Sequence, residues 1–155
     1  MSSRERHLDA RGNARMVDVG SKEPRPRRAV AQAVVRLGDP AIRALAEGGL
    51  AKGDALAVAR IAAIQAAKRT SDIIPLCHPL PLDHASAELH VDVAVGTVTI
   101  TTEVRTTART GVEMEALTAA TAGALAVYDM VKGEPGPAPI IENVRLLEKH
   151  VGDLP

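Results

Sequence analysis

The stretch "HASAELHVDVAVGTVTITTEVR", residues 84–105, carries the alternation of apolar and polar residues that decides the fold. Every odd position from 85 to 95 is Ala, Leu or Val, and the even positions 84 to 92 are His, Ser, Glu, His and Asp. After Gly96 one face continues as Val98, Ile100, Thr102 and Val104. A period of two is typical of a strand with one buried face. We therefore predict an antiparallel hairpin that turns at Gly96.

Helical and strand patterns flank this hairpin on both sides. Upstream we predict a strand over 28–37, a short helix over 39–49 with Asp39 as its N-cap, and a second helix that begins at Asp54. Downstream, the capping box Thr110-x-x-Glu113 opens a helix that runs to Lys132, and "IIENVRLLEK", residues 140–149, forms a last strand. This order favours an α+β, ferredoxin-like fold with helices on one face of an antiparallel sheet.

Length and composition narrow the class of protein. The 155 residues suit one domain, which we place at 16–155 after a polar N-terminal arm, 1–15, that we expect to be mobile. A single cysteine excludes an internal disulfide, and no signal peptide or bilayer-length apolar run is present, so we expect a cytoplasmic protein. Balanced charge, with 19 basic and 19 acidic residues, and one aromatic residue argue against nucleic-acid or membrane binding.

The segment "SDIIPLCHPLPLD", residues 71–83, places the one cysteine beside a histidine among three prolines. Neighbouring residues of an extended chain point to opposite sides, which makes Cys77 and His78 a poor nucleophile–base pair. A metal site is weakly supported, because His84 and His90 lie about 20 Å apart along a strand. Taken alone, the pair is interpreted as a buried cysteine and a loop histidine in a stiff turn.

Charged residues near helix ends form the other candidates. Lys52 precedes a helix N-terminus, where phosphate is favoured, and Lys68 lies two turns after Arg60 on the same helix. Asp129 and Lys132 are three residues apart on one helical face, so they can act as base and acid. Each signal has an ordinary alternative: cations at the rim of a core, or a surface salt bridge.

Five motifs in order resemble one family across most of the chain. They are "MVDVGSK" at 16–22, "KGDALAVARIAAIQAAKRT" at 52–70, "IIPLCHPL" at 73–80, "TGVEMEALTAAT" at 110–121 and "YDMVK" at 128–132. Together they resemble molybdenum cofactor biosynthesis protein C, the family of cyclic pyranopterin monophosphate synthases. The resemblance implies a lyase that converts 3',8-cyclo-7,8-dihydro-GTP to cyclic pyranopterin monophosphate with release of pyrophosphate.

The resemblance also assigns residues and an assembly. It implies a homohexamer, a trimer of dimers, with active sites between subunits, and no required cofactor, although magnesium can accompany the substrate phosphates. Asp129, Lys132 and Lys52 match the catalytic residues; Leu76, Cys77, His78, Glu113, Met114, Arg27 and Lys68 match substrate-binding positions. On this interpretation Cys77 is inert, and the segment 16–22 closes over the site.

Two other classes of function compete with this one. A non-catalytic nucleotide-sensing or assembly module on a ferredoxin-like fold would hold phosphate with cations but lack an acid–base pair among them. A nucleotide phosphohydrolase would need clustered carboxylates for a divalent metal, and the sequence contains no such motif.

Overall fold

The computed structural model describes residues 7–153 of the chain. Its elements are β1 (Arg25–Arg36), α1 (Asp39–Ala46), α2 (Ala55–Lys68), α3 (Thr70–Ile73), β2 (His84–Asp92), β3 (Thr97–Ala108), α4 (Glu113–Val131) and β4 (Ile140–Val151). The predicted order of strands and helices is confirmed, with the four-residue helix α3 as an addition that the sequence pattern does not predict.

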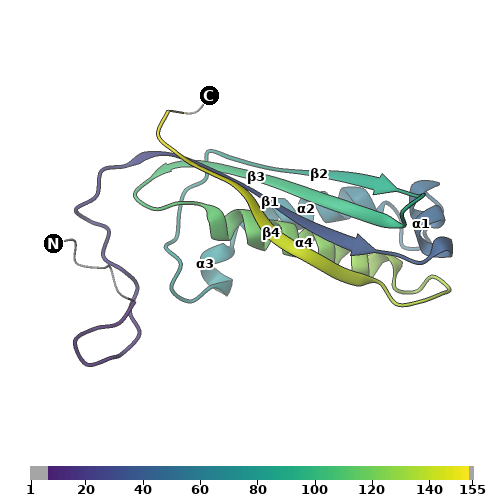
Figure 1. Ribbon diagram of the computed structural model, residues 1–155, viewed down its shortest axis with the longest axis horizontal. Helices are drawn as coiled ribbons and strands as arrows, with labels where there is room; N and C mark the ends of the chain where they lie inside the picture. The colour runs from purple at the N-terminus through teal and green to yellow at the C-terminus, as the bar shows by residue number, and fades with distance from the viewer. Residues whose placement is uncertain (1–6, 154–155) are drawn as a thin grey trace.

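The four strands form one antiparallel sheet in the order β2-β3-β1-β4, as expected for a ferredoxin-like fold. The predicted hairpin is β2 and β3, in which Leu89 pairs with Ile100 and the chain turns at Gly96 with a φ of 76°. Helices α2 and α4 pack on the same face of the sheet (Figure 1). The predicted α+β class is therefore confirmed, and no helix among residues 7–153 packs on the opposite face of the sheet.

The hairpin closes earlier than its alternating pattern suggests. Strand β2 ends at Asp92 rather than at Val95. The Asp92 carboxylate accepts a hydrogen bond from the Val95 backbone N at 3.0 Å, and the Asp92 carbonyl accepts one from Gly96 N at 2.8 Å. These bonds bend the chain before the turn, so Val95 lies exposed although it continues the apolar series.

Two of the three predicted helix caps are wrong. Asp39 lies inside the first turn of α1, where it pairs with Arg43, and Gly38 is the N-cap. The capping box of Thr110 and Glu113 does not form: α4 begins at Glu113, whose carboxylate pairs with Lys149 of β4 instead. The third cap is confirmed, because Asp54 accepts a hydrogen bond from Ala57 N at 2.9 Å.

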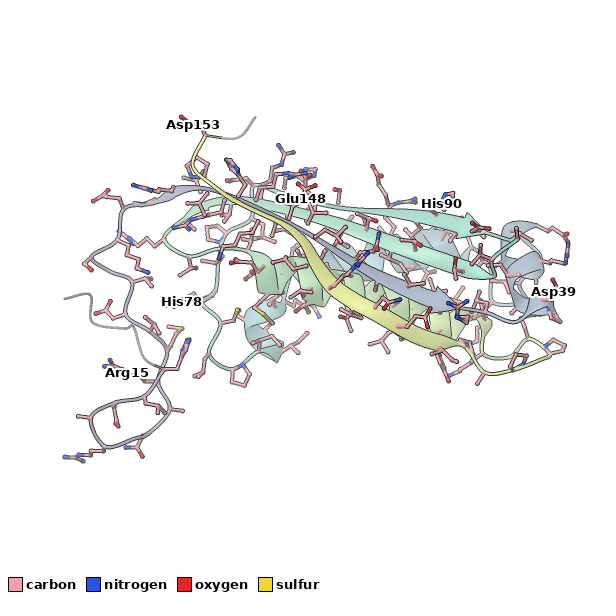
Figure 2. All side chains as sticks on the ribbon, viewed as in Figure 1. Arg15, Asp39, His78, His90, Glu148 and Asp153 are labelled. Atoms are coloured by element: carbon pink, nitrogen blue, oxygen red, sulfur yellow. The ribbon has the colours of Figure 1, made fainter. Side chains whose placement is uncertain are left out.

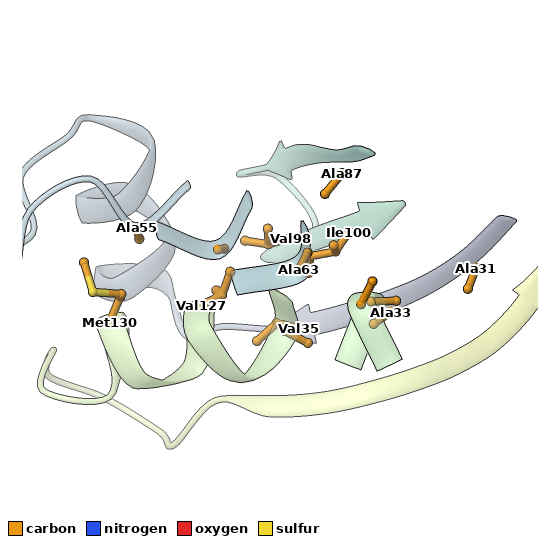
Figure 3. Packing of buried hydrophobic residues seen from close by; sticks show 14 of the residues in the cluster. Ala31, Ala33, Val35, Ala55, Ala63, Ala87, Val98, Ile100, Val127 and Met130 are labelled. Carbon is orange, nitrogen blue, oxygen red and sulfur yellow. The ribbon is translucent and has the colours of Figure 1, made fainter. Parts of the chain in front are cut away.

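Small side chains fill the space between the helices and the sheet. Figure 3 shows alanines, among them Ala33 and Ala63, beside Ile100, Val98 and Val127. A Cβ atom at Gly123 of α4 would lie 3.1 Å from Ile100 Cγ2 and 3.5 Å from Ala63 Cβ. Gly123 therefore lets α4 approach both α2 and β3 closely.

We expect Gly123→Leu to lower the free energy of unfolding by at least about 1–3 kcal/mol, because the added side chain has no space between these elements. Urea unfolding followed by circular dichroism measures this change. Ala122→Leu, one residue along the same helix and partly exposed, is the matched control and should cost much less. Equal losses in the two variants would contradict the close packing at Gly123.

The described part of the N-terminal arm has local structure. Leu8 and Ala14 form an isolated bridge, and the Asp9 carboxylate accepts hydrogen bonds from the backbone N atoms of Arg11 and Asn13, both at 2.8 Å. Residues 1–6 of the predicted mobile arm lie outside the described residues, and its mobility stays a prediction.

Candidate functional site

A pocket of about 500 Å³ lies at the N-terminal end of α4. Five of the predicted substrate-binding residues line it together: Leu76, Cys77, His78, Glu113 and Met114. The first three come from the proline-rich segment between α3 and β2, and the last two come from the first turn of α4. The structure thus joins two motifs that are more than thirty residues apart in the sequence.

The N-terminal arm forms another wall of this pocket. Val17, Val19 and Lys22 line it, and His78 Nε2 lies 2.7 Å from the Val17 carbonyl oxygen. Figure 2 shows His78 at the end of the molecule where the arm with Arg15 lies. Because the carbonyl can only accept, His78 donates from Nε2 and holds the arm against the pocket.

Cys77 is not paired with His78 in a nucleophilic dyad. The ring of His78 is bound to the arm, and the pKa of the partly buried Cys77 thiol is raised, first by burial and then by the negative charges of Glu115 and Glu113. A raised pKa favours the thiol over the reactive thiolate. The geometry therefore agrees with an inert cysteine in the pocket wall.

The first turn of α4 brings two glutamates to the pocket, and they differ in burial and in their partners. Glu113 is partly buried and pairs with Lys149. Glu115 is only 3% exposed, and its Oε2 has no hydrogen-bond partner among the described residues. Burial, with a further contribution from the charge of Glu113, raises the pKa of Glu115.

The three predicted catalytic residues lie together at the opposite end of α4. Asp129 Oδ1 is 2.7 Å from Lys132 Nζ, and Asp129 Oδ2 is 3.4 Å from Lys52 Nζ. Lys52 comes from the loop between α1 and α2 and also donates to the Asp129 carbonyl oxygen at 2.7 Å. We call Lys52, Asp129 and Lys132 the ion cluster; it carries two ammonium groups and one carboxylate, a net charge of +1.

The charges of the ion cluster reinforce each other. The hydrogen bond and charge of Lys132, together with the charge of Lys52, lower the pKa of Asp129. The same carboxylate raises the pKa of Lys132. In a single chain both shifts favour the charged forms of Asp129 and Lys132, so proton transfer by either group requires a change in its surroundings. A ligand phosphate or a covering surface would change that balance.

The pocket and the ion cluster are far apart in one chain. Sixteen positions of α4 separate Glu113 from Asp129, which is roughly 24 Å along the helix axis. In Figure 1 the loop that follows α4 lies at the end of the molecule near α1, away from the N-terminal arm. The structure therefore sorts the predicted site residues into two groups.

The remaining predicted cations, Lys68 and Arg27, flank the pocket without lining it. Lys68 lies in a hollow of about 400 Å³ that shares Leu80 with the pocket. Arg27 lies in a second hollow that shares Lys22 with it, and donates from Nε to the Ala108 carbonyl at 3.3 Å. Both cations thus lie in hollows that adjoin the pocket.

Several residues that line the pocket were not predicted individually from the sequence. The individual arm residues Val17, Val19 and Lys22 carry no local signal beyond the motif at 16–22, and Ile74 and Leu80 resemble ordinary loop residues. Glu115 does carry one: it precedes the buried Ala119 by four residues, so a glutamate occupies a core-facing helical position.

Among residues 7–153, no group of three or more His, Cys, Asp and Glu side chains is arranged to hold a metal ion. Within the same range no helix has the length and apolar character needed to cross a bilayer.

Comparison with known proteins gives one family match that covers all the helices and strands, the ion cluster and most of the pocket residues. The model of the MoaC family matches residues 16–152. A protein of Roseiflexus sp. (strain RS-1) named cyclic pyranopterin monophosphate synthase is 56% identical over 126 residues, 81% of this chain and 80% of that protein. One of the same name from Pelobacter propionicus is 48% identical over 146 residues, with coverages of 94% and 91%. Cyclic pyranopterin monophosphate synthase 2 of Mycobacterium bovis is 49% identical over 148 residues, with coverages of 94% and 86%.

Proposed function

The chain belongs to the MoaC family, and we propose that it acts as a cyclic pyranopterin monophosphate synthase, a lyase of molybdenum cofactor biosynthesis. The substrate is 3',8-cyclo-7,8-dihydro-GTP, and the products are cyclic pyranopterin monophosphate and pyrophosphate. The observation that carries an enzymatic role is the ion cluster, in which Asp129 lies between Lys52 and Lys132. A sensing module would need the cations but not the carboxylate between them, so this alternative is not favoured.

The two groups of residues suit different parts of this substrate. The pocket has mostly apolar walls, which suits a heterocycle. The ion cluster, with Lys68 and Arg27, supplies the positive charge that a triphosphate and a leaving pyrophosphate need.

We infer that each complete site is formed by two copies of the chain. A pocket of about 500 Å³ encloses one small molecule, which cannot also reach an ion cluster roughly 24 Å away along α4. A two-fold interface that places the C-terminal end of α4 of one copy at the pocket of the other would create two equal sites. Exposed apolar residues on the outer helical face, Val58, Ile61 and Leu125, are candidates for contacts between copies. The homohexamer that the resemblance implies, a trimer of dimers, would contain such pairs.

The residues then have distinct chemical tasks. Formation of a cyclic phosphate requires a substrate hydroxyl to attack the α-phosphorus, with transfer of its proton to a base such as Asp129. The bond between the α-phosphorus and the bridging oxygen breaks, and its electron pair leaves with pyrophosphate. Lys52 and Lys132 stabilise the charge that develops on the leaving oxygen, and Lys132 is placed to return a proton in the rearrangement of the rings.

Incubation of the purified protein with 3',8-cyclo-7,8-dihydro-GTP tests the proposed function. We expect cyclic pyranopterin monophosphate and pyrophosphate in equal amounts, measured by chromatography and an enzyme-linked pyrophosphate assay. Pyrophosphate without pterin would indicate a phosphohydrolase, and binding without either product would indicate a sensing module. Parallel reactions with magnesium and with a chelator test whether the cation accompanies the phosphates.

The cytoplasmic location expected from the sequence stays a prediction.

We expect His78→Ala to raise the KM and lower turnover, with a loss of about tenfold in kcat/KM, because the arm loses its hydrogen bond to the pocket. Steady-state kinetics measure the loss, and faster proteolysis between Met16 and Lys22 would report release of the arm. His90→Ala, an exposed histidine on β2 outside the pocket, is the matched control. Wild-type kinetics for His78→Ala would return this residue to a purely structural role.

A further inference from the structure

The loop between α4 and β4, residues 133–139, contacts the beginning of α1. A Cβ atom at Gly38 would lie only 2.7 Å from Pro137 Cδ and 2.9 Å from its Cγ, and one at Gly136 would lie 3.8 Å from Pro40 Cδ. Gly38 is the N-cap of α1, and Pro40 lies in its first turn. In Figure 1 this loop lies beside α1 at one end of the molecule. The ring of Pro137 thus rests on the backbone from which α1 begins.

This contact explains the glycine at position 38. Its φ of −70° and ψ of 162° are allowed for every residue, so the backbone conformation does not require glycine. A serine or aspartate at this position would cap α1, whereas Gly38 provides no side-chain hydrogen bond. Carbon atoms in contact lie about 3.5–4.0 Å apart, so a residue with a Cβ atom leaves no room for the ring of Pro137. The chain therefore has a close approach of the loop here in place of a helix cap.

Helix α1 in turn determines where Lys52 lies. The loop that carries Lys52 is hydrogen-bonded back to the helix, from Gly49 N to the Ala44 carbonyl oxygen at 2.8 Å. Leu50 of this loop is buried in the core, and its carbonyl oxygen accepts a hydrogen bond from Gly53 N at 3.1 Å. Because these contacts tie the loop to the helix, a shift of α1 would move Lys52 with it.

The other two residues of the ion cluster are held by α4 itself. Asp129 is in the last turn of this helix, and Lys132 is its C-cap, with a hydrogen bond from Lys132 N to the Tyr128 carbonyl oxygen at 2.9 Å. Lys52 reaches them from outside the helix and donates to the Asp129 carbonyl oxygen at 2.7 Å. Lys52 is therefore the member of the ion cluster whose place depends on how α1 sits against the end of α4.

We propose that Gly38 and Pro137 are positioning residues of the ion cluster: the ring of Pro137 packed on Gly38 holds α1 where Lys52 reaches Asp129. This inference rests on the proposed function for the reaction that the cluster serves, whereas the geometry can be tested without substrate. Neither residue touches the reacting atoms. They act through Lys52, because a catalytic group that is displaced by about 1 Å can lose up to about 100-fold in rate.

Two single substitutions and their combination test the packing. Gly38→Ala forces the ring of Pro137 to move by about 1 Å to restore ordinary contact, and Pro137→Ala removes the ring atoms that rest on Gly38. Each should lower the single-turnover rate of pterin formation by about tenfold. In Gly38→Ala/Pro137→Ala the new methyl group takes the place of the lost ring atoms, so the rate should recover to within about threefold of wild type.

Gly133→Ala is the matched control for these variants. It lies in the same loop and adds the same methyl group, but no atom lies within 4 Å of the added Cβ. Its rate should equal that of the wild type. A loss in Gly133→Ala as large as that in Gly38→Ala would overturn the proposal, because it would show that the rate responds to any change in the loop.

A double-mutant cycle with Lys52→Ala separates positioning from a general structural effect. If Gly38→Ala acts through Lys52, it should cost less than about twofold in the Lys52→Ala background. A purely structural role predicts the same loss in both backgrounds. That outcome, or a melting temperature of Gly38→Ala far below that of Gly133→Ala, would overturn the proposal.

Titration of the Asp129 carboxyl group by NMR, with isotope-labelled aspartate, tests the geometry without substrate. Lys132 and then Lys52 lower the pKa of Asp129. We therefore expect Gly38→Ala to raise the pKa of Asp129 toward its value in Lys52→Ala, and Gly133→Ala to leave it unchanged. An unchanged pKa in Gly38→Ala would overturn the positioning role whatever the activity. If the pKa rises but the wild type makes no pterin, the proposed function fails and the positioning of Lys52 stands.

Discussion

Asp129→Ala and Lys132→Ala should each lose about 10²- to 10⁴-fold in the rate of pterin formation, the usual contribution of a positioned acid or base. Their melting temperatures should stay near wild type, because both side chains are exposed and an exposed ion pair contributes little to stability. Single-turnover pterin formation and thermal unfolding measure the two effects. Asp39→Ala breaks the exposed pair of Asp39 and Arg43 on α1 and is the matched control, with activity near wild type.

The double variant Asp129→Ala/Lys132→Ala sharpens this prediction. If both residues serve one reaction, the double variant should lose far less than the product of the single losses. Activity within a few-fold of wild type in either single variant would reduce the ion cluster to a surface salt bridge, and it would contradict the catalytic role assigned to it.

The hairpin shows why the fold can be predicted so well from the sequence. A strand with one buried face must alternate, and Val98, Ile100 and Val104 are all fully buried in β3 as their spacing requires. The errors are at the ends of elements. There the outcome depends on a competing side-chain contact, such as Lys149 with Glu113, which no local pattern contains. The short helix α3 has no periodicity of its own to predict it.

The site was predictable to a different degree. Spacing alone places Asp129 and Lys132 on one helical turn, but Lys52 is 77 residues from Asp129, and only tertiary packing brings it there. The resemblance to a family supplied the identities of the pocket residues, and the structure groups five of them in one place. The distance between the pocket and the ion cluster follows from the length of α4. The sequence predicts that length, but only the structure shows that the two groups lie at opposite ends of the helix.

Two inactive variants should restore each other's activity when they assemble together. Met114→Trp fills the pocket, and Asp129→Ala removes the base from the ion cluster, so each variant alone should have under about 1% of wild-type activity. In mixed oligomers, a pocket from the Asp129→Ala chain can meet an ion cluster from the Met114→Trp chain. With random assembly both halves are intact in about one site in four.

A reciprocal mixture provides the control. When wild type is assembled with the double variant Met114→Trp/Asp129→Ala, shared sites also leave about one site in four intact. If each site were formed within one chain, half of the sites would instead stay intact. The shared-site model and the single-chain model therefore predict different activities even when the chains mix completely.

The most direct measurement is therefore pterin formation by mixed oligomers, co-expressed with two different tags and purified through both. The shared-site account predicts about a quarter of wild-type activity from the mixture of Met114→Trp and Asp129→Ala chains. Activity that stays at the level of the two separate variants, in oligomers shown to contain both chains, would contradict a site formed by two copies.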